Sequence, residues 1–171
     1  MVGCSLDNYA CEGGFLISSV EYLLTEGVAT DSCVPYVDAT TQCSFKCVNE
    51  SEPFKKYFCK PGSLKVATKT EQIQQELMNH GPMMVGLVVY EDFLSYQSGV
   101  YQFTTGELIG GHAMKMIGWG TDDEGYLYWI LQNQWSNEWG EQGFVNIKAG
   151  EIAIDSMAIA CDPEPGNEDE V

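Results

Sequence analysis

The stretch that decides the fold runs from Gly110 to Trp139. It holds two apolar segments, GGHAMKMIGWG (110–120) and YWILQNQW (128–135). A short acidic turn over 121–125 separates them, which predicts an antiparallel hairpin. His112 stands at the start of the first strand and Asn133 at the end of the second. Since hairpin pairing brings these two ends together, we expect His112 and Asn133 to be neighbours.

A histidine held by an asparagine side chain is an oriented imidazole, which is the base half of a nucleophilic catalytic site. The alternative for His112 is an ordinary histidine of the core whose hydrogen bonds are satisfied. Trp135 and Trp139 follow directly in the sequence. They are large apolar side chains, and core packing is the simplest role for both.

Length and charge limit the possible classes of protein. A chain of 171 residues can bury a sizeable core and usually forms one domain. Its 8 basic and 25 acidic residues give a formal charge of −17, which argues against nucleic acid or an anionic membrane as a partner. No apolar run approaches the ~20 residues that cross a bilayer. We therefore expect no nucleic-acid partner and no membrane span.

Seven cysteines in a chain of this size indicate a disulfide framework. Zinc is the rival interpretation, but the sequence has no Cys-x-x-Cys pair and only two histidines. We therefore expect no metal and no cofactor. The odd count leaves one cysteine without a partner in the chain.

Several motifs, in the right order, resemble the cathepsin B-like branch of the papain-like cysteine proteases. They are GHA (111–113), NQW (133–135), YEDFLSYQSGVYQ (90–102), TGE (105–107) and CEGG (11–14). The resemblance extends over residues 4–156. It implies a Cys-His-Asn peptidase in which His112 is the catalytic base, Asn133 orients it and Trp135 shields their hydrogen bond from water.

The resemblance implies an α+β, papain-like fold. It consists mainly of the antiparallel β-barrel (right) domain, with the last helix of the helical (left) domain. The expected peptidase domain is 1–161, with 1–30 as a remnant of the helical domain and 31–161 as the barrel with a disulfide-rich loop. The acidic, proline-containing tail 162–171 is expected to be disordered.

Hydrophobic periodicity gives the expected elements. Helices are expected over 15–26, with Gly27 as a C-cap, and over 70–80, with Thr70 as an N-cap. His80 at the end of the second helix is interpreted as structural. Strands are expected at 83–90, 99–103, 111–119, 126–132 and 143–148.

Further residue roles follow from the resemblance alone. Gly13 and Gly14 would bind the backbone of the substrate. Gly111 would also contact the substrate, and Gly86, Ala113 and Met157 would line the S2 pocket. Because Met157 stands where cathepsin B has an acidic residue, the pocket should prefer an apolar side chain over Arg.

The resemblance also implies cysteine pairing. Cys4 would pair with Cys43, and Cys33 with Cys47. Cys59 and Cys161 lie outside the family pattern and could pair with each other. Cys11 is left over, and its equivalent in the family bridges to a cysteine beside the nucleophile.

The nucleophile signature of the family, Cys-Gly-Ser-Cys-Trp, does not occur in these 171 residues. The middle position of the Asn-Ser-Trp motif is Gln134. We therefore expect this chain to carry the His/Asn half of a peptidase, to need a second segment for the nucleophile, and to be inactive alone. The alternatives are a pseudoprotease that serves as a binding or structural subunit, and a fragment of a full-length enzyme.

The expected partners are a peptide or protein substrate, if the site is complemented, and a second polypeptide that covers the cleft face. The expected location is lysosomal, vacuolar or secreted, although the sequence shows no signal peptide. One glycosylation sequon, Asn49-Glu50-Ser51, gives weak support to a secretory route.

Overall fold

The computed structural model describes residues 1–164, and these divide into two compact units. Unit 1 contains Met1–Leu64 together with the segment from Cys161, and unit 2 is Lys65–Ala160. The division between the units therefore falls after residue 64. The physical reason is that the disulfide-rich loop pairs with the first helix: Val28 bridges to Tyr57, and Cys59 N donates to Leu23 O.

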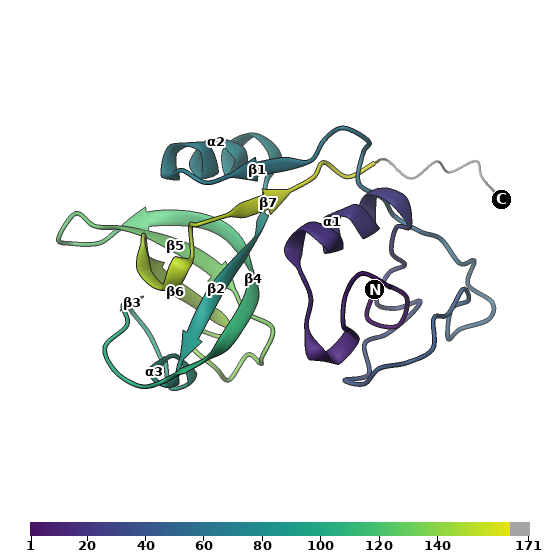
Figure 1. Cartoon of the computed structure of the whole chain (residues 1–171), viewed down its shortest axis with the longest axis horizontal. Coiled ribbons are helices and arrows are strands. Elements are labelled where there is room, and N and C mark those ends of the chain that lie inside the picture. Colours follow the sequence, from purple (N-terminus) through teal and green to yellow (C-terminus); the bar gives the residue numbers. More distant parts are fainter. Residues whose placement is uncertain (165–171) are drawn as a thin grey trace. The chain divides into compact units, whose positions relative to one another are not determined.

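Unit 1 has little regular structure besides the 3-10 helix η1 (Ala10–Glu12) and the helix α1 (Leu16–Thr25), shown in Figure 1. Val20 on α1 is completely buried, as expected for the apolar face of an amphipathic helix. Gly27 ends the helix with φ +67° and donates its N–H to Tyr22 O. This left-handed conformation is one that glycine adopts without a steric cost.

Three disulfides hold the irregular part of unit 1. They join Cys4 to Cys43, Cys33 to Cys47 and Cys59 to Cys161, which are the three pairings that we expected. Cys11 is a free, exposed cysteine. Cross-links of this kind stabilise the folded state, because they limit the conformational entropy of the unfolded chain. A loop with few core contacts depends on this stabilisation.

The segment 162–164 was expected to start a disordered tail, but the structure pairs it with the chain of unit 1. Lys60 N donates to Asp162 O over 2.8 Å, and Glu164 N donates to Phe58 O over 2.9 Å. The Cys59–Cys161 disulfide brings these two segments together, which explains the pairing. The rest of the expected tail, 165–171, lies outside the described residues.

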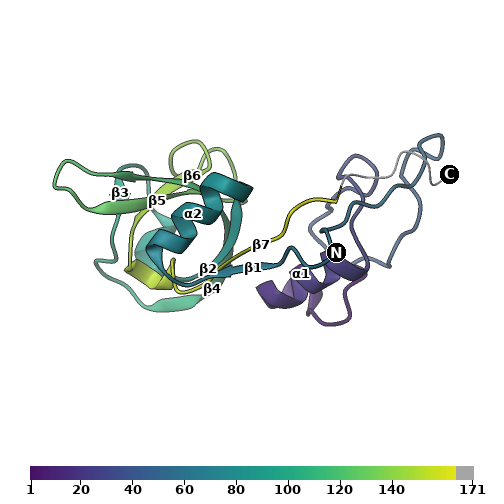
Figure 2. The ribbon, with the colours of Figure 1, turned by 90° about the horizontal axis from the view of Figure 1, so that it is seen from above.

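Unit 2 is built on one seven-stranded sheet in the order β1-β7-β2-β4-β5-β6-β3. The strands are β1 (Lys65–Ala67), β2 (Met83–Tyr90), β3 (Val100–Tyr101), β4 (Leu108–Thr121), β5 (Leu127–Gln132), β6 (Phe144–Lys148) and β7 (Ala158–Ala160). Its helices are α2 (Thr70–His80), α3 (Glu91–Leu94) and the 3-10 helix η2 (Glu151–Ala153). Figures 1 and 2 show α2 beside the sheet, where it packs against β1 and β4.

The α+β class is confirmed, but two details of the sheet differ from the expected antiparallel barrel. β3 pairs with β6 in parallel, and the edge strands β1 and β3 do not pair with each other within the described residues. The sheet is therefore mixed and open. The two edge strands are only three and two residues long, which limits the unpaired backbone that they present.

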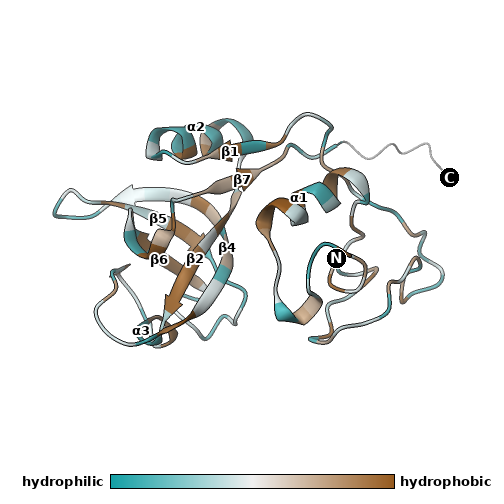
Figure 3. Ribbon diagram, in the orientation of Figure 1, coloured by the Kyte–Doolittle hydropathy of each residue, from teal (hydrophilic) through white to brown (hydrophobic). Residues whose placement is uncertain are grey.

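Alternation of side chains places the core of unit 2 on one face of its sheet. Met83, Val85, Leu87 and Val89 of β2 are buried and alternate with partly exposed residues. Figure 3 shows hydrophobic residues along β2, whereas hydrophilic residues cover much of α2. At the start of α2 the expected N-cap is wrong by one residue, because Lys69 is the cap and makes no side-chain capping bond.

A β-bulge interrupts β4. Met116 pairs with Leu131, but the next pair is Gly118 with Ile130, so Ile117 has no partner across the hairpin. Side chains of a regular strand alternate between its two faces, and the extra residue shifts this alternation by one. Met114 and Met116 before the bulge and Trp119 after it therefore all pack against the same core.

A carboxylate at the start of α3 holds the loop that follows β3. Asp92 Oδ1 accepts a hydrogen bond from the Tyr101 hydroxyl at 2.7 Å. Asp92 Oδ2 accepts from Thr104 N and Oγ1, both at 2.9 Å, and from Thr105 N at 3.2 Å. Partial burial raises the pKa of Asp92, but the bonds from Thr104, Tyr101 and Thr105 outweigh it and hold this pKa below its usual value.

We expect Asp92→Asn to lower the free energy of unfolding at pH 7 by about 2 kcal/mol, because it removes a charged acceptor of several hydrogen bonds. The folded pKa is depressed, so the stabilisation is fully present above about pH 4, the pKa of unfolded Asp, and is lost as pH falls through the folded value. Urea unfolding of the wild type and the variant from pH 7 to pH 2 measures this. A difference that did not shrink in acid would contradict the assignment.

Candidate active site

His112 on β4 and Asn133, which directly follows β5, meet at the open end of the hairpin. The distance from His112 Nε2 to Asn133 Oδ1 is 2.8 Å. The strand register explains the contact. Lys115 of β4 pairs with Gln132 of β5, and continuing this antiparallel register away from the turn brings His112 beside the segment that follows β5. The hairpin thus brings together the two residues that the sequence placed at its ends.

The hydrogen bonds to Asn133 fix the protonation of His112. Asn133 Oδ1 also accepts the backbone N–H of Gln134 at 2.9 Å, and a backbone N–H can only donate, so this atom is the amide oxygen. His112 Nε2 must then carry the proton that it donates to Oδ1. In the neutral imidazole this leaves Nδ1 as the proton acceptor. The pair is therefore a base with a defined reactive nitrogen.

Aromatic side chains pack around this pair. The Trp135 ring stacks on the His112 ring with centroids 5.0 Å apart and an interplanar angle of 29°. Phe93 of α3 and Trp139 pack edge-on or tilted against Trp135 and each other, at 5.1 to 5.8 Å. Asn133 is only 7% exposed. The rings limit access of water to the His–Asn bond, which strengthens it.

Gln134 makes a bond that the sequence did not reveal. Its side-chain Nε2 donates to Ala113 O over 2.9 Å, while its backbone N–H donates to Asn133 Oδ1. The residue after Asn133 is thus tied to the residue after His112. Phe93 was also missed as a site residue, although it lies in the matched segment 90–102 and its aromatic type was the available signal.

Three of the four expected substrate-binding residues of unit 2 lie close together on its sheet. Gly86 of β2 is opposite Ala113 of β4, and Met157 immediately precedes Ala158, which pairs with Val85. None of the three is buried, whereas Val85 and Ala158 are. Gly111 is two residues along β4, opposite Val88, and a Cβ there would meet open space.

The other expected substrate-binding residues, Gly13 and Gly14, belong to unit 1. Gly13 has φ +104°, and a Cβ on Gly14 would collide with the side chain of Asn8. Asn8 Oδ1 accepts the backbone N–H of Phe15 at 2.8 Å, so this close approach is part of the local fold. In the same unit Thr40 Oγ1 donates to Cys11 Sγ at 3.4 Å.

Within residues 1–164 no group of three or more His, Cys, Asp or Glu side chains is placed to hold a metal ion. None of the helices in this described part is long and apolar enough to span a bilayer.

Comparisons with known proteins agree on one family. The family model for papain family cysteine protease matches residues 1–161. Cathepsin B-like protease 1 of Arabidopsis thaliana is 37% identical over 95% of this chain and 47% of its own length. Cathepsin B-like CP3 of Giardia intestinalis is 38% identical over 93% of this chain and 55% of its own. The chain thus spans about half the length of these curated relatives.

A solved structure agrees with these relatives. The structure described as proCathepsin B S9 from Trypanosoma congolense has a TM-score of 0.88 and 31% identity. It covers 96% of this chain, which in turn covers 59% of that one.

The geometry predicts the tautomer of His112. We expect nitrogen NMR to show that the neutral form of His112 carries its proton on Nε2, and Asn133→Ala to produce a mixture of both tautomers, since the acceptor is removed. His80, the other histidine of the sequence, serves as the internal control and should not respond. A wild-type His112 protonated on Nδ1 would contradict the assigned hydrogen bond.

Proposed function

Because the chain belongs to the papain family of cysteine proteases, we propose that it supplies the His–Asn half of a cathepsin B-like peptidase that cleaves peptide bonds by acyl transfer. The observation that carries the proposal is the 2.8 Å contact of His112 Nε2 with Asn133 Oδ1, which leaves Nδ1 free to accept a proton. The aromatic rings of Trp135 and Phe93 support the same assignment.

In the proposed reaction, His112 Nδ1 takes the proton of a cysteine thiol, and the thiolate attacks the carbonyl carbon of the substrate. The imidazolium then protonates the amine that leaves, and a water molecule releases the acyl group with the same base. Asn133 keeps the ring in register throughout. Six of the seven cysteines of this sequence are in disulfides, so we place the nucleophile on residues outside these 171.

We further propose that a second polypeptide segment covers part of this chain and is bridged to Cys11. The free thiol is exposed, and three strongly exposed apolar residues, Leu6, Tyr9 and Phe15, stand near it in the sequence. Exposed apolar groups of this kind mark surfaces that are covered in an assembly. In unit 2, buried Asn133 Nδ2 has no hydrogen-bond partner among the described residues, and an acceptor from such a segment would satisfy it.

The three disulfides and the cathepsin B-like relatives support a lysosomal, vacuolar or secreted location for this protein.

The intact mass of native material, with and without reductant, tests the proposal. We expect reduction to release a second polypeptide from Cys11, and an electrophilic epoxide probe to label a thiol on that polypeptide. In the assembled protein, His112→Ala should lower kcat/KM by roughly 10³-fold, as expected for loss of a general base. Asn133→Ala should cost roughly ten- to a hundredfold, for about 1–3 kcal/mol of lost hydrogen bonding.

The contrary result is equally clear. If the mass is that of this chain alone and no thiol is labelled, the peptidase proposal fails. The His112–Asn133 pair would then be the remnant of a peptidase site in a protein that binds other proteins without cleaving them.

We also propose that Met157 sets the specificity of the S2 pocket. Met157 is partly buried and stands beside Gly86 and Ala113 on one side of the sheet, so the pocket that they would form has no acidic group among these three. An apolar side chain at P2 of the substrate would therefore bind better than Arg.

A single substitution tests this assignment in the assembled enzyme. Met157→Glu should raise kcat/KM for Arg at P2 relative to Leu at P2 by roughly fivefold, because a partly exposed ion pair contributes about 1 kcal/mol. Met157→Gln, which has nearly the same shape and no charge, should leave the ratio unchanged. A wild-type enzyme that preferred Arg at P2 would refute the proposal.

A further inference from the structure

The loop that follows the Cys33–Cys47 disulfide contains Asn49-Glu50-Ser51, which is the only Asn-x-Ser or Asn-x-Thr triplet in the 171 residues. The middle residue is not proline, so the triplet has the form that the glycosylating enzyme requires. The proposed peptidase function does not use this motif. Whether it is used for modification depends on the geometry of the loop and on its environment.

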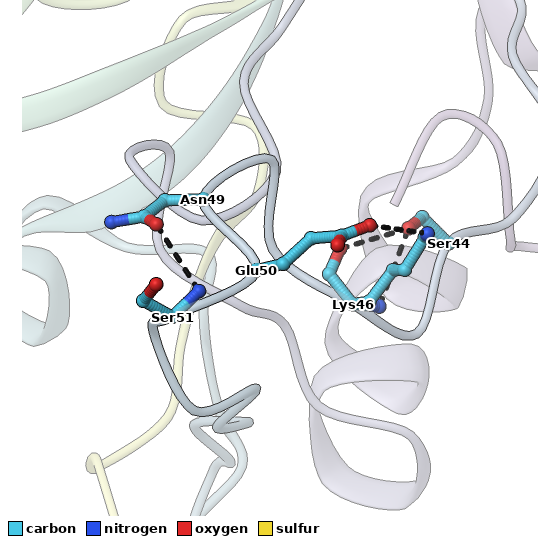
Figure 4. A network of polar contacts seen from close by, with 5 residues as sticks. All are labelled: Ser44, Lys46, Asn49, Glu50 and Ser51. Carbon is cyan, nitrogen blue, oxygen red and sulfur yellow. Dashed lines mark hydrogen bonds and ion pairs between the residues drawn. The ribbon is translucent and has the colours of Figure 1, made fainter.

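The loop presents Asn49 to solvent in an open turn. Asn49 and Ser51 are both exposed. Ser51 N donates to Asn49 Oδ1 over 3.1 Å, and Glu52 N donates to Asn49 O over 3.0 Å. The side-chain oxygen of Asn49 is therefore engaged in the turn, whereas its Nδ2 has no hydrogen-bond partner in the described part of the chain. Figure 4 shows this amide nitrogen at the outer end of the side chain.

The carboxylate of Glu50, which lies between Asn49 and Ser51 in the sequence, points away from both residues. Lys46 Nζ lies 3.0 Å from Glu50 Oε1, and Lys46 N donates to Ser44 Oγ on the same side of the loop. Figure 4 shows Glu50 pointing toward Lys46, with Asn49 and Ser51 at the opposite end of the turn. A lipid diphosphate donor is strongly anionic, so a carboxylate that faces away avoids like-charge repulsion at the acceptor nitrogen.

The position of the loop in unit 1 leaves room for a bulky group. Val48, next to Asn49, is 69% exposed, and Phe45 is 68% exposed. The loop is anchored behind the motif, because Val48 N donates to Cys33 O and Cys47 is in a disulfide. The disulfides favour an oxidising compartment, which is the route on which asparagine glycosylation takes place.

We propose that Asn49 carries an N-linked oligosaccharide. In the transfer, Asn49 Nδ2 forms a bond to C1 of a sugar chain that is bound to a lipid diphosphate. The bond from C1 to the diphosphate oxygen breaks, its electron pair leaves with the lipid diphosphate, and Nδ2 loses one proton to a base of the transferase. No oxidant or reductant is needed. A glycan on Asn49 would stand over the exposed apolar residues of this loop.

Peptide mapping of the native protein tests the proposal. Trypsin, which cleaves after lysine, releases residues 47–55 as one peptide. After treatment with a glycan-removing amidase in heavy-oxygen water, we expect this peptide to contain aspartate with one heavy oxygen at position 49. Recovery of the peptide with unmodified Asn49 from untreated protein, and no label after treatment, would overturn the proposal.

The chain provides a matched internal control. Asn137 is also exposed, lies in a turn and is followed by a glutamate, but the third position of its triplet is Trp139 and not Ser or Thr. The tryptic peptide 116–148 that contains it should acquire no heavy oxygen. Label at both asparagines would show chemical deamidation, and would count against glycosylation.

Variants provide a second arm that does not depend on native material. In the full chain, secreted from a eukaryotic host, Asn49→Gln and Ser51→Ala should both abolish one discrete mass increment, and Asn137→Gln should retain it. Ser51→Ala keeps the backbone N–H that bonds Asn49, so loss of the increment in this variant cannot be attributed to a disrupted turn. An increment that persists in Ser51→Ala would exclude Asn49 as the acceptor.

Discussion

The antiparallel pairing of β4 with β5 is the constraint on which the candidate active site depends. His112 on β4 and Asn133 just after β5 both lie at the open end of this hairpin, so their 2.8 Å contact forms only when the register is correct. Trp129 and Leu131 of β5 are completely buried against the same core as Met114 and Met116 of β4. The burial of these side chains fixes the strand register, and the register in turn fixes the geometry of the His112–Asn133 pair at the edge of the hydrophobic core.

Unit 1 is stabilised differently. Much of its chain is irregular, and its large exposed apolar residues include Leu6, Tyr36 and Phe45. Three disulfides and a few backbone bonds take the place of an extensive core. Such a segment can change its surface without unfolding, which suits a part of the molecule that we propose to carry a glycan and to contact a second polypeptide.

Strong local patterns predicted most of unit 2 from the sequence. The helix at 70–80 was predicted at its observed bounds because its apolar period is followed by Gly81-Pro82, and the buried strand 83–90 because of its apolar run. The strands β1 and β7 were missed, because three residues carry no period and their pairing joins Lys65 to Ala160 across the whole unit. The end of unit 1 at residue 64 depends on long-range contacts in the same way.

In the candidate site, too, the features that depend on local sequence were predictable and those that depend on tertiary contacts were not. His112 and Asn133 were predictable because the hairpin is local and each stands at the end of an apolar strand. The bond from Gln134 Nε2 to Ala113 O was not, because a glutamine side chain finds its acceptor only after the tertiary structure has formed. The position of Phe93 beside Trp135 is likewise a result of packing between α3 and the segment after β5.

The bulge at Ile117 has a consequence for how this hairpin can vary among related chains. Side chains alternate between the faces of a strand, so removal of one residue between His112 and Gly118 would turn Ala113 toward the core and His112 toward the opposite face. The turn over 121–125, by contrast, lies at the far end of the hairpin, where added residues leave that alternation intact. Relatives should therefore differ freely in the length of the turn, while a length change at the bulge would separate the histidine from its asparagine.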